Sequence, residues 1–239
     1  MRARCNSAVE GQSSPQTTTS ESALNDLLVN LSINRLSALK NLFTRQNQKK
    51  SNEKIIIVSG LPRSGTSMMM KMLAEGGVPT VVDSLREADE DNPNGYFEIE
   101  SSKRLKDGEK KWLYNARGKA VKVISYLLEF LPDNLSYDII FMEREIGEIL
   151  ASQRKMLQRR NETSALSDSE MEAQFREHLR AVKYWSARKP NMRILYVKYS
   201  EMVGAPEKLC NSIVDFLDTP LDLKAMQSVP NQSLYRNRS

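Results

Sequence analysis

The stretch IIIVSGLPRSGTS, residues 55–67, decides the fold. Four β-branched residues are followed by a turn rich in glycine and proline, and an apolar stretch at residues 68–73 continues beyond it. This order is typical of a buried strand, a tight loop and a helix. The last eight residues nearly match the phosphate-binding loop G-x-x-x-x-G-K-[ST], but Thr66 stands where that motif has its lysine.

The altered loop indicates an anion site that works without a metal ion. Backbone N–H groups and a helix N-terminus can still cradle an anion here, although the lysine is missing. A nucleoside triphosphatase would also need an aspartate at the end of a second apolar strand to position Mg²⁺. The best such strand, YDIIFMER at residues 137–144, ends instead in Glu143 and Arg144. We therefore expect a less highly charged phosphate group and no metal.

Composition bounds the class of protein. The chain has 239 residues and a formal net charge of +5, a bias too small and too dispersed to indicate nucleic acid. Its two cysteines, Cys5 and Cys210, lie far apart, no apolar leader follows the start, and no apolar run approaches the roughly 20 residues of a membrane helix. We expect a cytoplasmic protein with no transmembrane segment and no nucleic-acid partner.

Two regions are predicted along the chain. Residues 1–53 combine a tail rich in Ser, Thr and Gln, an apolar pattern of helical spacing at residues 23–43, and a polar linker. We interpret them as a disordered tail, a peripheral helix and a linker. Residues 54–239 are predicted to form the α/β domain.

Strand and helix patterns alternate in this domain. After the first strand, short β-like runs occur at residues 78–82, 120–124, 139–142 and 193–197, and helical patterns at residues 146–157 and 169–187. Such alternation predicts an α/β fold in three layers, a parallel sheet with helices on both faces, similar to that of P-loop proteins.

The motif LPRSGTS resembles the 5′-phosphosulfate loop of sulfotransferases that use 3′-phosphoadenosine 5′-phosphosulfate (PAPS). In that family an arginine at a strand end and a serine eight residues later grip the 3′-phosphate, and Arg144 and Ser152 have this spacing. The stretch AVKVISYLLEFLP, residues 120–132, is similar to a segment that carries lysine and then histidine; Lys122 matches the lysine and Ile124 replaces the histidine.

The resemblance, closest to small bacterial-type sulfotransferases, implies transfer of a sulfuryl group from PAPS to a hydroxyl or amine of a small-molecule or glycan acceptor. It implies cofactor binding by six loop and helix residues besides Arg144: Arg63, Ser64, Gly65, Thr66, Ser67 and Ser152. Arg63 and Lys122 would stabilise the transferred group. The Gly-rich terminal motif of cytosolic members is absent, and Arg236 and Arg238 offer a partial substitute.

The general base is expected to be a carboxylate. The single histidine, His178, lies in a charged helical run remote from every cofactor element, so we interpret it as structural or exposed. The acidic stretch at residues 83–100 follows a predicted strand, where strand ends face the ligand crevice. Within it, the sequence separation of Glu87 from Arg63 is close to that in sulfotransferases that use a glutamate as the base. Asp83 and Glu98 are alternatives.

Two other functions compete with this one. A small-molecule kinase on the same fold would require Mg²⁺, and a protein that binds 3′-phosphoadenosine 5′-phosphate (PAP) without turnover would keep the loop and lose transfer. The sequence predicts neither a particular acceptor nor an oligomeric state. Acceptor specificity resides in loops and pocket shape.

Overall fold

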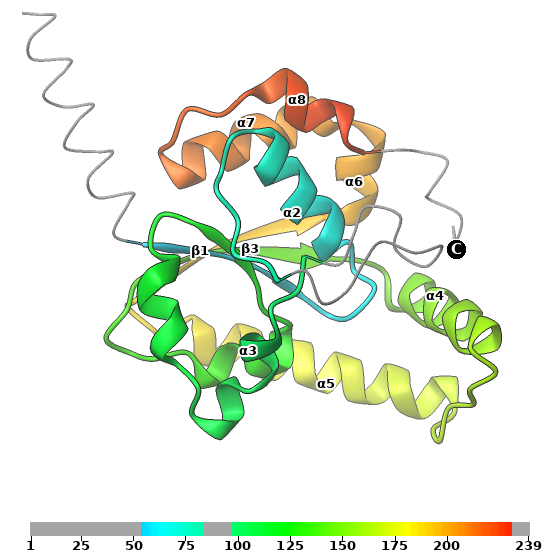
Figure 1. The fold of residues 1–239 in the computed structure, drawn as a ribbon. Helices are drawn as coiled ribbons and strands as arrows, with labels where there is room; N and C mark the ends of the chain where they lie inside the picture. The colour runs from blue at the N-terminus through cyan, green and yellow to red at the C-terminus, as the bar shows by residue number, and fades with distance from the viewer. Residues whose placement is uncertain (1–53, 84–96, 231–239) are drawn as a thin grey trace, which may run out of the picture. The chain divides into compact units, whose positions relative to one another are not determined.

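The computed structural model describes residues 54–83 and 97–230. The predicted tail, helix and linker of residues 1–53 lie outside the described residues, as do Glu87 and both arginines of the C-terminal tail. The described chain forms a four-stranded parallel sheet with the order β2-β1-β3-β4 (Figure 1). The strands are β1 (Ile55–Gly60), β2 (Ala120–Lys122), β3 (Tyr137–Glu143) and β4 (Met192–Lys198).

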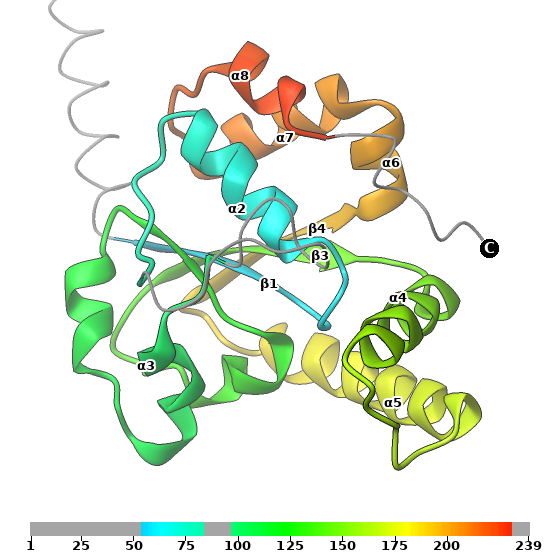
Figure 2. The same cartoon turned by 45° about the vertical axis from the view of Figure 1, so that its right-hand side comes forward.

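Helices cover both faces of the sheet. The α-helices are α2 (Thr66–Glu75), α3 (Glu100–Lys103), α4 (Ile146–Arg159), α5 (Asp168–Ser186), α6 (Tyr199–Gly204), α7 (Pro206–Leu217) and α8 (Leu223–Ser228). Three 3₁₀ turns are η1 (Leu105–Asp107), η2 (Lys111–Ala116) and η3 (Ser125–Phe130). Helices α2, α6, α7 and α8 pack on one face, and α5 and the 3₁₀ turns pack on the other (Figures 1 and 2). The predicted three-layer α/β class is confirmed.

The core follows the two-residue period of the central strands. Along β1, Ile56 and Val58 face the cluster around α2, whereas Ile55 and Ile57 face the cluster around α5 and η3. All six residues of β1 are buried, as expected for a central parallel strand covered on both faces. The apolar run that opens the sequence motif therefore forms the middle of the sheet.

The strand predicted at residues 78–82 does not form. The structure has only an isolated parallel bridge between Thr80 and Ala120 at this place. The Val81 N–H donates to the Ala120 carbonyl at 2.9 Å, and the Ala120 N–H donates to the Pro79 carbonyl at 2.8 Å. Pro79 has no N–H to extend the ladder, and β2 itself is only three residues long. The β-branched residues at 78–82 are typical of a strand, but β2 is too short to form a longer ladder with them.

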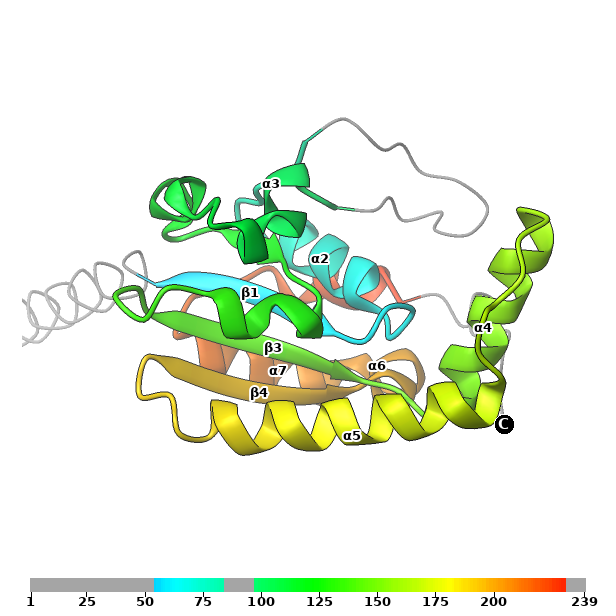
Figure 3. The same ribbon diagram turned by 90° about the horizontal axis from the view of Figure 1, so that it is seen from below.

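The order of the strands opens a crevice beside the loop after β1. The chain leaves β1 toward α2 on one face, and it leaves β3 toward α4 and α5, which pack together in a separate cluster. Adjacent parallel strands whose connections diverge in this way create the usual ligand site of open α/β sheets. Figure 3 shows α4 beyond the carboxyl ends of the strands and α5 lying along β4.

Leu61 is predicted to anchor the loop to α4. This loop residue is 2% exposed and packs in one cluster with Ile146, Ile149 and Leu150. Leu61→Ala should lower the free energy of unfolding by about 2–5 kcal/mol, because the loss of buried methyl groups leaves a cavity. Urea denaturation checks this, with Leu166→Ala as the control, since Leu166 is 38% exposed. Equal midpoints for the two variants would contradict the packing role.

Candidate functional site

Two glycines bring the loop close to its neighbours. Gly60 has a φ of 148°, and a Cβ there would lie 2.7 Å from the Met142 carbonyl oxygen. Gly65 has a φ of 100°, and its Cβ would lie 2.5 Å from Cδ2 of Tyr199. Neither position has room for a side chain, and both φ values are in the region that glycine alone adopts readily. The loop therefore sits against the end of β3 on one side and against α6 on the other.

The loop presents polar groups that a bound anion would satisfy. Ser64 is 1% exposed, and its Oγ has no hydrogen-bond partner in the part of the chain that the structure describes. Helix α2 starts at Thr66 with no side-chain N-cap and no acidic residue in its first turn. Buried hydroxyls nearly always have a partner, and a helix N-terminus attracts negative charge. The loop has the properties of an anion cradle.

Arg63 connects the loop to α4. Its φ of 69° places it in the left-handed region, which is uncommon for a residue with a side chain. Its Nε donates a hydrogen bond to Ser152 Oγ at 3.0 Å, across 89 residues of sequence. The resemblance stated above implies that these two residues bind different phosphate groups of one nucleotide, and in the structure they are in direct contact.

Arg144 completes the connection from the end of β3. Its Nη1 donates to the Arg63 carbonyl at 3.1 Å. Its Nε donates to Glu148 Oε2 at 2.8 Å, and the two side chains are only 8% and 4% exposed. The guanidinium carbon lies 4.2 Å from the centre of the Tyr199 ring, a cation–π contact. The guanidinium is held on two edges and one face.

Sequence reasoning missed Glu148 and Tyr199. The i,i+4 spacing of Arg144 and Glu148 was the available signal for that ion pair. No local signal pointed to Tyr199, which follows β4 and reaches both Gly65 and Arg144. Burial raises the pKa of the Tyr199 phenol above its ordinary value, so this ring stays neutral beside the arginine.

Lys122 lies at the end of β2 and is 8% exposed. Its Nζ donates to Ser67 Oγ at 3.3 Å, in the first turn of α2, and forms an ion pair with Glu98 Oε1 at 3.2 Å. Glu98 also lies 3.6 Å from Lys103 Nζ. The structure thus brings the predicted lysine to the helix that begins at the loop, and it gives that lysine a carboxylate partner.

The three candidate bases have different surroundings. Glu87 lies outside the described residues, so its assignment stays a prediction. Asp83 Oδ2 accepts a hydrogen bond from the Glu100 N–H at 2.6 Å, at the first residue of α3. That contact gives Asp83 a structural role at a helix N-terminus. Glu98 contacts Lys122 directly.

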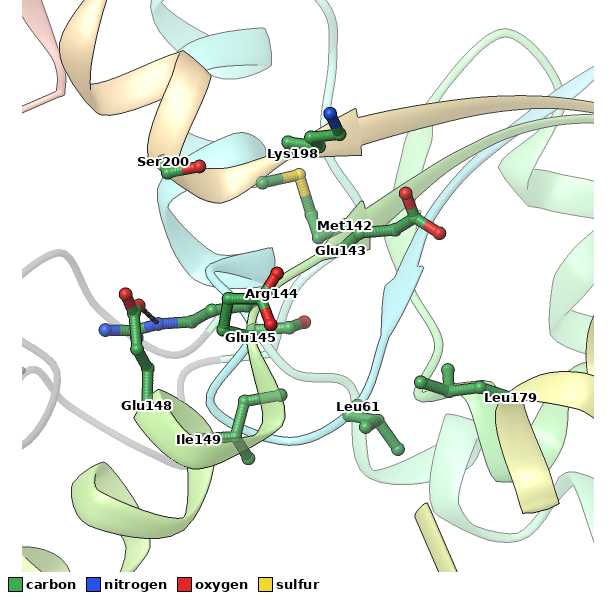
Figure 4. Close-up of a pocket in the computed structure, with 11 residues that line it drawn as sticks. Leu61, Met142, Glu143, Arg144, Glu145, Glu148, Ile149, Leu179, Lys198 and Ser200 are labelled. Atoms are coloured by element: carbon green, nitrogen blue, oxygen red, sulfur yellow. Dashed lines mark hydrogen bonds and ion pairs between the residues drawn. The ribbon is translucent and has the colours of Figure 1, made fainter. Parts of the chain in front are cut away.

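A cleft of about 220 Å³ lies at the carboxyl ends of β3 and β4 (Figure 4). It includes Ser64 and Arg144, and Lys198 lines it at the end of β4. Three carboxylates also line it, contributed by Glu143, Glu145 and Glu148. In Figure 4 the Glu148 side chain extends toward the Arg144 guanidinium, and a dashed line joins them. Both signs of charge therefore meet where the loop and α4 approach each other.

His178 packs against η3 and lies next to Leu179, which lines the cleft. Its Nε2 lies 2.9 Å from Ser125 Oγ, and its ring stacks on Tyr126 with centroids 3.7 Å apart and planes at 15°. These contacts join α5 to η3. They agree with the structural interpretation of this residue.

The stability of the fold is predicted to respond to His178 protonation. Burial lowers the pKa of this imidazole below its ordinary 6.5, because the charged form loses hydration. The unfolded chain therefore binds the proton at a higher pH, and this residue's stabilisation is lost as the pH falls below about 6.5. In His178→Gln, the decrease in urea midpoint between pH 7.5 and pH 5 should be smaller than in the parent. Identical decreases would contradict this role.

Residues 54–83 and 97–230 contain no group of three or more His, Cys, Asp or Glu side chains arranged to hold a metal ion. In the same ranges, no helix has the length and apolar character needed to cross a membrane.

Comparison with known proteins identifies the family. A model described as "Sulfotransferase family" matches residues 95–223, which is more than half of the chain. The match begins beyond the loop, so it is independent of the LPRSGTS motif. The chain therefore belongs to the sulfotransferase family, and the resemblance stated from its motifs is confirmed. No curated protein matches the chain.

Several solved structures are similar to this chain. The sulfotransferase domain of the Synechococcus PCC 7002 olefin synthase is 14% identical, with a TM-score of 0.48, over 78% of this chain and 83% of that one. Mouse sulfotransferase SULT7A1 complexed with PAP is 16% identical, with a TM-score of 0.46, over 78% of this chain and 67% of that one. The sulfotransferase domain of the curacin biosynthetic pathway is 14% identical, with a TM-score of 0.43, over 72% of this chain and 76% of that one.

Proposed function

We propose that this sulfotransferase moves a sulfuryl group from PAPS to a hydroxyl or amine of a small-molecule or glycan acceptor. The main support is the contact of two predicted phosphate sites. Arg63 of the loop donates to Ser152 of α4, and Arg144 donates to the Arg63 carbonyl. A nucleotide with phosphate groups at both its 3′ and 5′ positions matches such a pair of adjoining anion sites.

The residues present fit this nucleotide. Its 5′ end would lie on the loop, where the buried Ser64 hydroxyl has no partner in the described chain and α2 begins without a cap. The proposed 5′ contacts come from the loop and the first turn of α2: Arg63, Ser64, Gly65, Thr66 and Ser67. The 3′-phosphate would be gripped by Arg144 and Ser152. When bound, PAPS would supply the sulfuryl group and the nucleotide leaving group.

Cationic and acidic side chains then have separate roles in transfer. Arg63 belongs to the loop, and Lys122 contacts Ser67 in the first turn of α2. From these positions the two cations stabilise negative charge on the oxygens around the transferred group. Glu98 holds Lys122 through the 3.2 Å ion pair. Because Glu98 is committed to this lysine, we retain Glu87 as the base that accepts the proton of the acceptor hydroxyl or amine.

Nucleotide preference tests the proposed 3′-phosphate site. The parent should bind PAP more tightly than adenosine 5′-phosphate in calorimetry. In Arg144→Gln this preference should fall about 10- to 100-fold, because charge-assisted hydrogen bonds contribute about 1.5–3 kcal/mol. Ser152→Ala should cause a smaller loss in the same direction. A parent that binds both nucleotides equally would refute the assignment.

Arg154→Ala is the control, because Arg154 lies on α4, the helix that carries Ser152, and its side chain is 61% exposed. This variant should bind PAP like the parent. Binding should also survive excess EDTA, because Thr66 replaces the loop lysine and no aspartate ends the strand at residues 137–144 to position Mg²⁺. Loss of binding on chelation, restored by Mg²⁺, would favour a kinase. Tight PAP binding without transfer to any acceptor would favour a non-catalytic binding protein.

The identity of the base is tested by three carboxylate substitutions. Glu87→Gln should lower turnover by roughly 10²-fold or more, with PAP affinity unchanged. It should also abolish the limb of the pH–rate profile in which the rate rises as a carboxyl group ionises. Glu98→Gln should lower turnover but keep that pH limb, because it weakens the ion pair that holds Lys122 and leaves the base in place. Asp83→Asn should alter stability more than turnover. If Glu98→Gln loses the pH limb instead, the base is Glu98.

A further inference from the structure

We propose that Glu148 is a counter-charge built into the nucleotide site, which positions Arg144 and limits how tightly the site holds a 3′-phosphate. The proposal rests on the function proposed above, because it takes Arg144 as the 3′-phosphate ligand. Glu148 lines the same cleft as Arg144 (Figure 4), and Ser64 also lines this cleft. Its role would be to set nucleotide affinity and release.

The geometry restricts the arginine to one orientation. Glu148 Oε2 accepts from Nε at 2.8 Å, the Arg63 carbonyl accepts from Nη1 at 3.1 Å, and the Tyr199 ring lies 4.2 Å from the guanidinium carbon. A planar guanidinium held on its Nε edge, on one Nη and on one face cannot rotate freely. It is therefore pre-organised for a ligand, so that little conformational entropy is lost on binding.

The burial of the pair indicates a role beyond surface charge pairing. With side chains only 4% and 8% exposed, both groups have given up most of their hydration. Such pairs are costly to bury and gain little net stability, while removal of one partner leaves an uncompensated charge. In the absence of nucleotide, Glu148 keeps the buried arginine neutralised. When a 3′-phosphate is present, the phosphate and the carboxylate must share the same guanidinium.

This sharing has a consequence for affinity. A carboxylate on the guanidinium edge repels a phosphate bound to the same group, and this repulsion is only partly screened in a buried site. The pair contributes no net charge, so 3′-phosphate recognition relies on the directed hydrogen bonds of Arg144. After transfer, the desulfated nucleotide must leave, and Glu148 would speed its release.

The test separates the charge of Glu148 from its hydrogen bond. Glu148→Gln keeps an oxygen that can accept from Arg144 Nε and removes the negative charge. We expect its affinity for PAP to rise about tenfold or more and its affinity for adenosine 5′-phosphate to change less than threefold. The thermal shift caused by saturating PAP should increase in parallel. Calorimetry and thermal denaturation measure both quantities without an acceptor.

Two other substitutions complete the design. Glu145→Gln is the matched control, because Glu145 is an exposed carboxylate that lines the same cleft, and it should bind PAP within threefold of the parent. Glu148→Asp keeps the charge but shortens the reach to Nε, so its PAP affinity should fall. This variant still tests the proposal if Glu148→Gln does not fold.

The outcomes distinguish the two proposals. If the parent prefers PAP but Glu148→Gln binds it no more tightly, or if Glu148→Asp binds it as tightly as the parent, the counter-charge role is wrong and the 3′-phosphate site stands. An equal gain in Glu145→Gln would also overturn the specific role of Glu148. If the parent has no preference for PAP over adenosine 5′-phosphate, both proposals fail.

Discussion

The hydrogen bond from Arg144 to the Arg63 carbonyl joins the two halves of the site. It depends on the central pairing of β1 with β3, which ends with Gly60 opposite Met142. That register places the loop after β1 beside the residue that follows β3. The absence of a side chain at Gly60 permits the same proximity, because a Cβ there would meet the Met142 carbonyl. The order and register of the strands therefore bring the loop and Arg144 together, and the side chains then form the contacts between them.

Cationic side chains from the loop and from two strand ends lie at the site, although the loop has no lysine. Thr66 occupies the lysine position of the loop motif, while Lys122 reaches the first turn of α2 from β2 and contacts Ser67. Arg63 and Arg144 supply two more cations. Glu98 forms an ion pair with Lys122, and Glu148 forms one with Arg144. An anion in this place would meet oriented hydrogen-bond donors with their counter-charges already present. Such an arrangement favours recognition by geometry over simple attraction.

The family match and the loop motif lie in different parts of the chain. The family model begins at residue 95, and the loop motif ends at Ser67. The contact between Arg63 and Ser152 links these two parts within the domain. Because the sequence match and the loop geometry are independent, their agreement strengthens the proposal of a nucleotide site. The acceptor is a separate question, which depends on the surfaces around the cleft.

The sequence by itself determined the features that are local. A β-branched run, two glycines and a following apolar stretch were enough to predict strand, loop and helix. The resemblance to sulfotransferases then identified Arg144 and Ser152, eight residues apart, as the second element. Tertiary structure alone decided which distant groups meet: Arg63 with Ser152, Lys122 with Glu98, and Tyr199 with Arg144. It also decided that residues 78–82 form one bridge and no strand. Turns and periodicity are set by neighbouring residues, whereas these contacts depend on the order and length of strands that pair across the whole domain.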